Sequence, residues 1–475
     1  MTVTILQPRV PLGDPHDCTD AADELCILGA IYDTLLRRDG TGFTPALAES
    51  WQVSDDARTW SFHLREGVTF HDGSPCDAAA VQASLERMDR EDKGYTLGSP
   101  AVWRQYLNGA EYTAEGLDLT VRLAEPMADF PDVLVQGFIV APSAFAALDA
   151  GDPTAHCGTG PYRLAARSDD EIRLEAVDAA HWPAPENPSL IWRCEPDADA
   201  RRRAVEAGSA HVATTVAPDS EITTGTLIRY RAPVAIIYLL NAAKGPLKDP
   251  RIRRALTLAV DRNALIDDVM NGQAKPLRGF VSPAHFGADA TAGASRDPDT
   301  ARALLAEAGH AGGLTLAVDC PTRLPDEAPE LTQALADQLA EVGITLDIHM
   351  HEDREAYAHM VRRKEIRDLC VFDSSPMSTF RVLYEKIDSR VAGAWWQGYA
   401  NPAVEDLIDR GRRTTDGDQR AALYRQAYRL LQEDPPWLTL YNPMRAILLA
   451  GRHPDFTMPV DGVPDMRALP RMEGN

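Results

Sequence analysis

The chain has 475 residues, of which 44% are hydrophobic and 25% are charged, a composition typical of a globular protein. Lysine and arginine number 48 against 71 aspartate and glutamate residues, so the formal charge is −23. This acidic balance argues against non-specific binding to nucleic acids and to anionic membranes. The length predicts two or three domains. The longest strongly apolar run, residues 234–240, is far shorter than the about 20 residues of a membrane-spanning helix.

The amino-terminal segment lacks the basic, apolar and small-residue regions of a secretory signal. Two interpretations stay open: a cytoplasmic chain, or a chain from which a signal has been removed. The cysteines do not form the disulfide framework of a small secreted fold, because they are mostly far apart and odd in number. They are Cys18, Cys26, Cys76, Cys157, Cys194, Cys320 and Cys370.

The first half of the chain alternates between predicted strands and helices. Polar and apolar residues alternate over 2–6, 60–64 and 117–123, which predicts strands. One helix is expected over 21–37, and another follows Asp77, a good N-cap. These patterns indicate an α/β chain.

The second half repeats the alternation with longer helices. Residues 234–240 predict a buried strand, and Asp249-Pro250 opens a long helix that Gly272 would terminate. Residues 314–348 predict a strand–helix–strand unit, which we expect to be parallel and right-handed. A short strand over 369–372 and two helices after residue 402 follow. Because no linker interrupts the chain, we expect domains joined by several crossings.

Motifs of common enzyme chemistry are missing from the sequence. There is no Walker loop, no Gly-x-Ser-x-Gly elbow, no Cys-x-x-Cys and no His-Glu-x-x-His. His349 and His351 share one strand face, but a zinc site needs further ligands, and two surface histidines are the simpler interpretation. The adjacent Trp395 and Trp396 either divide between the core and a cleft or lie partly buried at a domain corner.

Several motifs follow one another in order along nearly the whole chain. They lie at 31–35, 45–51, 60–65, 67–73, 158–162, 249–262, 398–402 and 420–436. This series resembles the family 5 extracellular solute-binding proteins of ABC importers, which include oligopeptide, dipeptide and nickel binders. For most of these residues a scaffold role is expected, so the motifs indicate the fold more than the ligand.

The resemblance implies an α/β, periplasmic-binding-protein-like fold of type II, with two lobes that close on a ligand. Motif order assigns 1–40, 155–235 and 445–475 to lobe I, 41–154 to a subdomain inserted in it, and 236–444 to lobe II. The implied function is capture of a peptide-like or other small polar solute (a peptide, an opine or similar) for a membrane permease. The resemblance implies a monomer in the periplasm or otherwise outside the cytoplasm, with no catalytic residues, cofactor or metal.

The resemblance also implies ligand-binding residues. In peptide-binding relatives an aspartate after a lobe II strand pairs with the ammonium group of the peptide, and Asp373 stands at that place, beside Ser374 and Ser375. A turn-forming role for Asp373 stays open. The relatives' tryptophan and tyrosine are replaced here by Cys370 and Ser374, so the pattern departs from that of peptide binders. Further residues expected at the ligand are Asp17, Thr19, Arg104, Arg390, Trp395, Trp396, Tyr441 and Asn442.

Two alternatives remain from the sequence. A cytoplasmic solute sensor or enzyme on the same fold agrees with the missing signal and the free thiols. An unrelated α/β enzyme is the other alternative, although no nucleophile–base set is visible.

Overall fold

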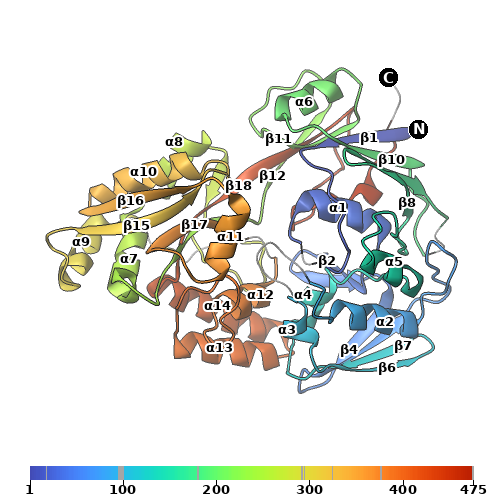
Figure 1. Ribbon diagram of the computed structural model, residues 1–475, viewed down its shortest axis with the longest axis horizontal. Helices are drawn as coiled ribbons and strands as arrows, with labels where there is room; N and C mark the ends of the chain where they lie inside the picture. Colours follow the sequence, from blue (N-terminus) through green and yellow to red (C-terminus); the bar gives the residue numbers. More distant parts are fainter. Residues whose placement is uncertain are drawn as a thin grey trace. The chain divides into compact units, whose positions relative to one another are not determined.

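The computed structural model describes residues 1–17, 19–94, 101–178, 181–289, 293, 295–323, 325–374 and 377–472 (Figure 1). The described residues form two compact units. Unit 1 contains the described residues up to Tyr230 and those from Arg445 onward, and unit 2 contains Arg231–Met444. The predicted division into lobe I, an inserted subdomain and lobe II stays a prediction.

The main sheet of unit 1 runs in the order β18-β11-β1-β10-β9-β8, and its central strand β1 is parallel to both neighbours. One face packs against α1, α5 and the carboxyl-terminal segment, and α6 packs against the other. The elements of this layer are β1 (Thr2–Gln7), α1 (Ala22–Ile31), η1 (Pro142–Ala144), α5 (Phe145–Asp149), β8 (Tyr162–Arg167), β9 (Glu171–Ala176), β10 (Ser189–Cys194), α6 (Ala198–Glu206), β11 (Val212–Val216), β12 (Thr226–Arg231) and η3 (Met466–Ala468).

A second, four-stranded sheet of unit 1 has the antiparallel order β4-β5-β7-β6, and α2 packs against β6 and β7. Strand β5 alternates buried and exposed residues, as its sequence predicts. The elements of this part are β2 (Leu36–Asp39), β3 (Gly42–Pro45), β4 (Ala48–Val53), β5 (Thr59–Leu64), α2 (Ala78–Met88), α3 (Arg104–Leu107), β6 (Glu111–Glu115), β7 (Asp118–Arg122) and α4 (Phe130–Leu134).

The sheet of unit 2 runs in the order β16-β15-β17-β13-β18. Strands β15, β16 and β17 are parallel, as expected for the strand–helix–strand unit, whereas β13 is antiparallel to both of its neighbours. The elements are β13 (Ala235–Leu240), η2 (Pro246–Lys248), α7 (Pro250–Ala259), α8 (Arg262–Met270), β14 (Ala274–Pro276), α9 (Pro298–Glu307), β15 (Leu314–Pro321), α10 (Ala328–Ala340), β16 (Ile344–His351), α11 (Arg354–Arg362), β17 (Leu369–Ser374), α12 (Thr379–Lys386), α13 (Pro402–Arg413), α14 (Gly417–Glu433) and β18 (Trp437–Leu449).

Helices cover both faces of this sheet (Figure 1). Residues of α7, α8, α9 and α10 form one core with alternate residues of the strands, including Ile236, Tyr238 and Tyr441. Residues of α11, α12, α13 and α14 form the other core with the intervening strand residues, such as Ile237 and Phe372. Every residue of β13 is buried, which agrees with the predicted buried strand.

Two predicted helices are shorter than expected. The helix predicted over 21–37 ends at Ile31, because the next residues turn into extended backbone and Asp33 is buried among tertiary hydrogen-bond partners. The helix predicted from residue 250 to Gly272 is two helices, α7 and α8. The second helix starts anew at Asp261, whose carboxylate accepts the backbone N–H groups of Asn263 and Ala264.

The chain passes between the units at residues 230–231 and within β18 at 444–445. Asn442 joins these two segments inside unit 2. Its Oδ1 accepts hydrogen bonds from Arg231 at 3.0 and 2.5 Å, and its Nδ2 donates to the Val234 carbonyl at 2.6 Å. Among the described residues, no helix has the length and apolar character required to cross a lipid bilayer.

Candidate ligand-binding site

The carboxyl edge of the parallel strands in unit 2 brings several of the predicted residues together. Strand β17 ends at Ser374, and Asp373 lies opposite Ile236 at the start of β13. Ile236 in turn lies opposite Tyr441 of β18. In open α/β sheets ligands bind outside the carboxyl ends of the strands. Asp373, Ser374 and Tyr441 therefore lie on neighbouring strands near this edge of the sheet.

Asp373 and Tyr441 point to the same face of the sheet, because residues in register across neighbouring strands share a face. Tyr441 is fully buried, and its hydroxyl donates to Oε1 of Glu327 at 2.9 Å. Burial raises the pKa of the Tyr441 hydroxyl, and the charge of Glu327 raises it further. Tyr441 thus connects Glu327 to the sheet face that also carries Asp373.

Ser374 points to the opposite face of β17, where it is buried. Its Oγ accepts a hydrogen bond from the ammonium group of Lys386 in α12 at 3.3 Å. Ser375 lies outside the described residues.

The two tryptophans have different surroundings. Trp395 packs against Phe372 of β17, with ring centroids 4.6 Å apart. The indole N–H of Trp396 donates to the Tyr399 carbonyl at 2.6 Å. Both side chains are partly exposed. Trp395 therefore lies on the face of β17 opposite to the side chain of Asp373.

The loop that carries these tryptophans is held by its backbone. The ammonium group of Lys364 donates to the carbonyls of Gly393 and Ala394. The Gln397 side chain donates to the Val361 carbonyl at 2.8 Å. Gly398 has φ +88°, and a Cβ atom there would lie 2.4 Å from Ala243. These contacts hold the loop in addition to those of the tryptophan side chains.

Arg390 is engaged in ion pairs within this part of unit 2. Its guanidinium binds both carboxylate oxygens of Asp388, at 2.8 and 2.5 Å, and contacts Asp409 at 2.6 Å. These hydrogen bonds raise the pKa of the Arg390 guanidinium. The structure therefore gives Arg390 a role in fixing the loop, as it gives Asn442 a role where the chain leaves the unit.

Three of the predicted ligand-binding residues, Asp17, Thr19 and Arg104, belong to unit 1. Thr19 accepts the backbone N–H of Ala21 at 3.1 Å, just ahead of α1, and Asp17 lies in the turn that begins at Asp14. Arg104 forms an ion pair with Glu91 at 2.7 Å. Local contacts thus involve both Thr19 and Arg104.

Sequence reasoning missed Arg354, the first residue of α11. Its guanidinium stacks over the rings of Phe372 and Tyr357, with its central carbon 4.9 and 5.7 Å from the centroids. Its Nε and Nη1 atoms are buried, and neither has a hydrogen-bond partner among the described residues. The signal that could have found it is its position three residues after strand β16, at the carboxyl edge.

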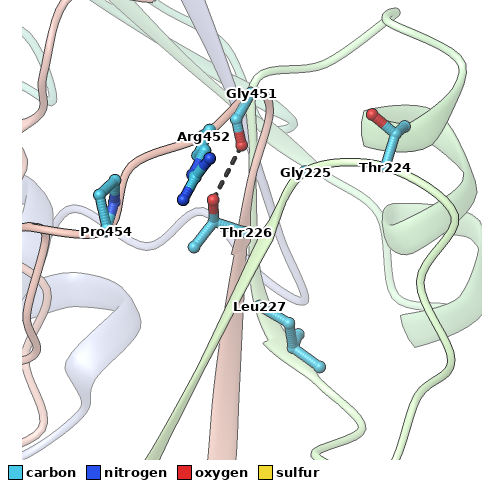
Figure 2. Close-up of a pocket in the computed structure, with 7 residues that line it drawn as sticks. All are labelled: Thr224, Gly225, Thr226, Leu227, Gly451, Arg452 and Pro454. Atoms are coloured by element: carbon cyan, nitrogen blue, oxygen red, sulfur yellow. Dashed lines mark hydrogen bonds between the residues drawn. The ribbon is translucent and has the colours of Figure 1, made fainter.

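Unit 1 also contains a surface pocket of about 590 Å³ (Figure 2). It lies between the start of β12 and the segment after β18, where the Thr226 hydroxyl donates to the Gly451 carbonyl at 2.8 Å. The lining residues are Thr224, Gly225, Thr226, Leu227, Gly451, Arg452 and Pro454. None of the residues predicted to bind a ligand belongs to this pocket.

In the described part of the chain, no group of three or more histidine, cysteine, aspartate or glutamate side chains could hold a metal ion. The two histidines of β16 have separate carboxylate partners. His351 lies 2.8 Å from Asp319, and His349 lies 2.9 Å from Asp347.

Two α/β units connected by two crossings of the chain are the architecture that the sequence predicts for a solute-binding protein. A sequence profile described as "Bacterial extracellular solute-binding proteins, family 5 Middle" matches residues 42–380. The chain therefore belongs to the family 5 solute-binding proteins of ABC importers, as the order of its motifs predicts.

Known relatives agree with this assignment. The glutathione-binding protein GsiB of Shigella boydii serotype 4 is 27% identical over 452 residues, which cover 90% of this chain and 86% of the relative. The crystal structure of the ABC transporter substrate-binding protein CtaP from Listeria monocytogenes matches with a TM-score of 0.84 at 19% identity, covering 99% of each chain. The periplasmic binding protein DppA from Helicobacter pylori, solved with the peptide STSA, matches with a TM-score of 0.77 at 21% identity, covering 95% and 94% of the two chains. These matches confirm the predicted fold class.

Proposed function

We propose that this protein captures a peptide-like or other small polar solute outside the cytoplasm and delivers it, as a monomer, to an ABC permease. The family assignment supports delivery to a permease, and the relatives that bind glutathione or a peptide support the solute class. Binding shifts the population from an open to a closed state, since a ligand that contacts both lobes favours the closed form. No catalytic step is required.

The observation that carries the proposed ligand site is the placement of Asp373. It is the last residue but one of the parallel strand β17, near the carboxyl edge at which open α/β sheets bind ligands, and it shares a sheet face with Tyr441, which hydrogen-bonds to Glu327. A cationic group, such as the ammonium group of a peptide, would be attracted by these two carboxylates. Asp17, Thr19, Arg104, Arg390, Trp396 and Ser375 remain further candidates for ligand contacts.

The test begins with native mass spectrometry of the purified protein, to detect a small molecule that co-purifies. Thermal-shift and calorimetric titrations then use glutathione, di- and tripeptides and opines as probes. We expect at least one probe to bind, to raise the melting temperature and to decrease the radius of gyration measured by small-angle X-ray scattering. Binding of no probe, together with unchanged scattering, would contradict the proposal.

A matched pair of variants tests the site. Asp373→Asn removes the proposed partner of the ammonium group, and we expect at least tenfold weaker binding of the probe found above. Asp347→Asn removes an exposed carboxylate of β16, which is separated from β17 by β15 in the same sheet and pairs with His349, and should leave the affinity unchanged. Equal affinities of both variants and the wild type would place the ammonium group elsewhere.

A further inference from the structure

Thr215, near the end of strand β11 in unit 1, has a backbone conformation that threonine rarely adopts. Its φ is +51°, in the left-handed region, where a β-branched side chain crowds the backbone and costs conformational energy. The strand forms a β-bulge here, because residues 213 and 216 of β11 are in register with residues 448 and 446 of β18. Glycine suits a left-handed bulge position because it has no Cβ atom. Thr215 therefore stands where glycine would be less strained.

Arg201 of α6 holds this strained backbone in place. Its side chain is 2% exposed, and its guanidinium donates to the carbonyls of Thr214 at 3.0 Å and Thr215 at 2.7 Å. It also donates to the carbonyls of Glu195 and Pro196, at 2.6 and 2.9 Å. Strain of this kind persists where the surrounding structure over-determines it, and the hydrogen bonds of one buried guanidinium do so here.

The side chain of Thr215 gains nothing from the fold in return for this strain. It is exposed, whereas its neighbours Thr214 and Val216 are buried. Its hydroxyl has no hydrogen-bond partner among the residues that the structure describes. Strained residues of this kind cluster at functional sites, where the strain serves to pre-organise a contact. The exposed hydroxyl is thus available to a partner outside the chain.

Thr215 lies at the edge of the unit 1 sheet where three parallel strands end. Strand β1 lies between β10 and β11 and is parallel to both (Figure 1). The three strands end at residues 7, 194 and 216. The segment with Asp17 and Thr19, which the sequence predicts to contact a ligand, leaves the sheet at this edge after β1. Ligands of open α/β sheets bind at the carboxyl edge, and a bulge there re-aims a side chain.

We propose that the Thr215 hydroxyl forms a hydrogen bond with an uncharged polar group of the transported solute, such as a peptide amide. This inference rests on the proposed function and adds a specificity-determining residue in unit 1. A hydroxyl both donates and accepts hydrogen bonds, so it matches either the N–H or the C=O of an amide. The solute thus supplies the hydrogen-bond partner that the described chain does not.

The test measures binding by calorimetry and the melting temperature by scanning calorimetry, with glutathione and a library of di- and tripeptides as probes of the full chain. Thr215→Val removes the hydroxyl at nearly constant shape, and we expect about three- to tenfold weaker binding with an unchanged melting temperature. Thr215→Ser keeps the hydroxyl and should bind within about twofold of the wild type. The control Thr113→Val removes the hydroxyl of an exposed threonine in β6 of the same unit and should change neither quantity.

Thr215→Gly separates the strain from the binding. Glycine adopts a positive φ without a steric penalty, and we expect this relief to outweigh the greater flexibility that glycine gives the unfolded chain. The variant should therefore melt at a higher temperature than the wild type and yet bind the probe less tightly. A protein that is more stable but binds more weakly has not lost its affinity through unfolding.

The outcomes distinguish the inference from the proposed function. Unchanged affinity of Thr215→Val, for a probe that binds the wild type, would overturn the contact and leave the proposed function standing. Weaker binding of Thr215→Gly alone would also overturn it, because the bulge and not the hydroxyl would then matter. A melting temperature of Thr215→Gly at or below that of the wild type would overturn the strain argument on which the contact rests. Binding of no probe to the wild type would overturn the inference and the proposed function together for these ligands.

Discussion

Replacing Asp33 by asparagine tests whether one carboxylate organises the region of unit 1 that follows α1. Asp33 is only 1% exposed. Its Oδ2 accepts hydrogen bonds from Thr159 at 2.9 Å, from His181 at 3.1 Å and from the Trp182 indole at 2.9 Å. Its Oδ1 accepts from Arg37 at 3.2 Å. Segments far apart in the sequence therefore meet at this side chain.

Asparagine keeps the shape of the side chain but not its acceptors. In either orientation of the amide, its N–H₂ group faces a donor that the carboxylate had accepted. Breaking a buried ion pair in this way costs about 3–5 kcal/mol. Each kcal/mol lowers the melting temperature of a unit of this size by about 2–4 °C, so Asp33→Asn should lower that of unit 1 by roughly 6–20 °C.

The pH dependence gives an independent check. Burial alone would raise the pKa of Asp33, but the hydrogen bond from His181 and the charges of Arg467 and Arg37 lower it to about 2. Because the folded-state pKa lies below the ordinary value of 3.8, the stabilisation is complete above about pH 4 and is lost as the pH falls toward 2. This component amounts to about 2 kcal/mol in the wild type and is missing from Asp33→Asn.

Differential scanning calorimetry at pH 7 and between pH 4 and 2 measures both effects. The control is Asp55→Asn, an exposed aspartate of the same unit, which should change the stability by no more than about 0.5 kcal/mol. A melting temperature of Asp33→Asn within about 2 °C of the wild type, an interval that corresponds to at most about 1 kcal/mol, would refute the assigned role of the carboxylate.

Three further changes test other parts of the chain. Arg87 is buried in unit 1 and forms ion pairs with Asp14 and Asp149. Arg87→Met should lower the free energy of unfolding, measured by urea denaturation, by about 3–5 kcal/mol, and Arg87→Lys should lower it by less. Gly398→Ala should cost about 2–4 kcal/mol, because its positive φ and its contact with Ala243 exclude a side chain, whereas Gly417→Ala, with open space around the Cβ position, should be nearly neutral. Burial lowers the pKa of Lys364 from 10.5 to about 8, so the unfolded chain binds more protons between these values and the stability contribution of this group rises with pH there. Thermal melts from pH 7.5 to 10.5 should show that rise in the wild type and not in Lys364→Met.

The sequence predicts strands well where burial alternates or is complete. Strand β5 alternates between buried and exposed residues, and β13 is buried throughout. The spacing of the hydrophobic residues and the length of each run were therefore sufficient to predict both strands. The ends of helices were less predictable. Ile31 ends α1 because Asp33 is required by partners more than 120 residues away, and no local pattern carries that information.

The predicted site residues likewise separate into those that local sequence patterns place and those that depend on distant neighbours. The ordered motifs placed Asp373 after a strand over 369–372, whereas the structure extends β17 to Ser374 and includes Asp373 as its last residue but one. Residue type could not show that Arg390 binds Asp388 and Asp409, or that Asn442 holds the crossing segments, because both depend on long-range neighbours. Arg354 was missed because an arginine that begins a helix looks like a surface residue until its buried donors are seen.

The anchoring of the tryptophan loop has a consequence for ligand specificity. Lys364 and Gln397 hold the loop through backbone carbonyls, and Arg390 holds its start through ion pairs. Because ordering a loop on binding weakens affinity, a loop ordered in advance leaves more of the contact energy for the ligand. Trp396 adds the hydrogen bond from its indole N–H to the Tyr399 carbonyl, and Trp395 packs on Phe372, so the two side chains contribute to the same order.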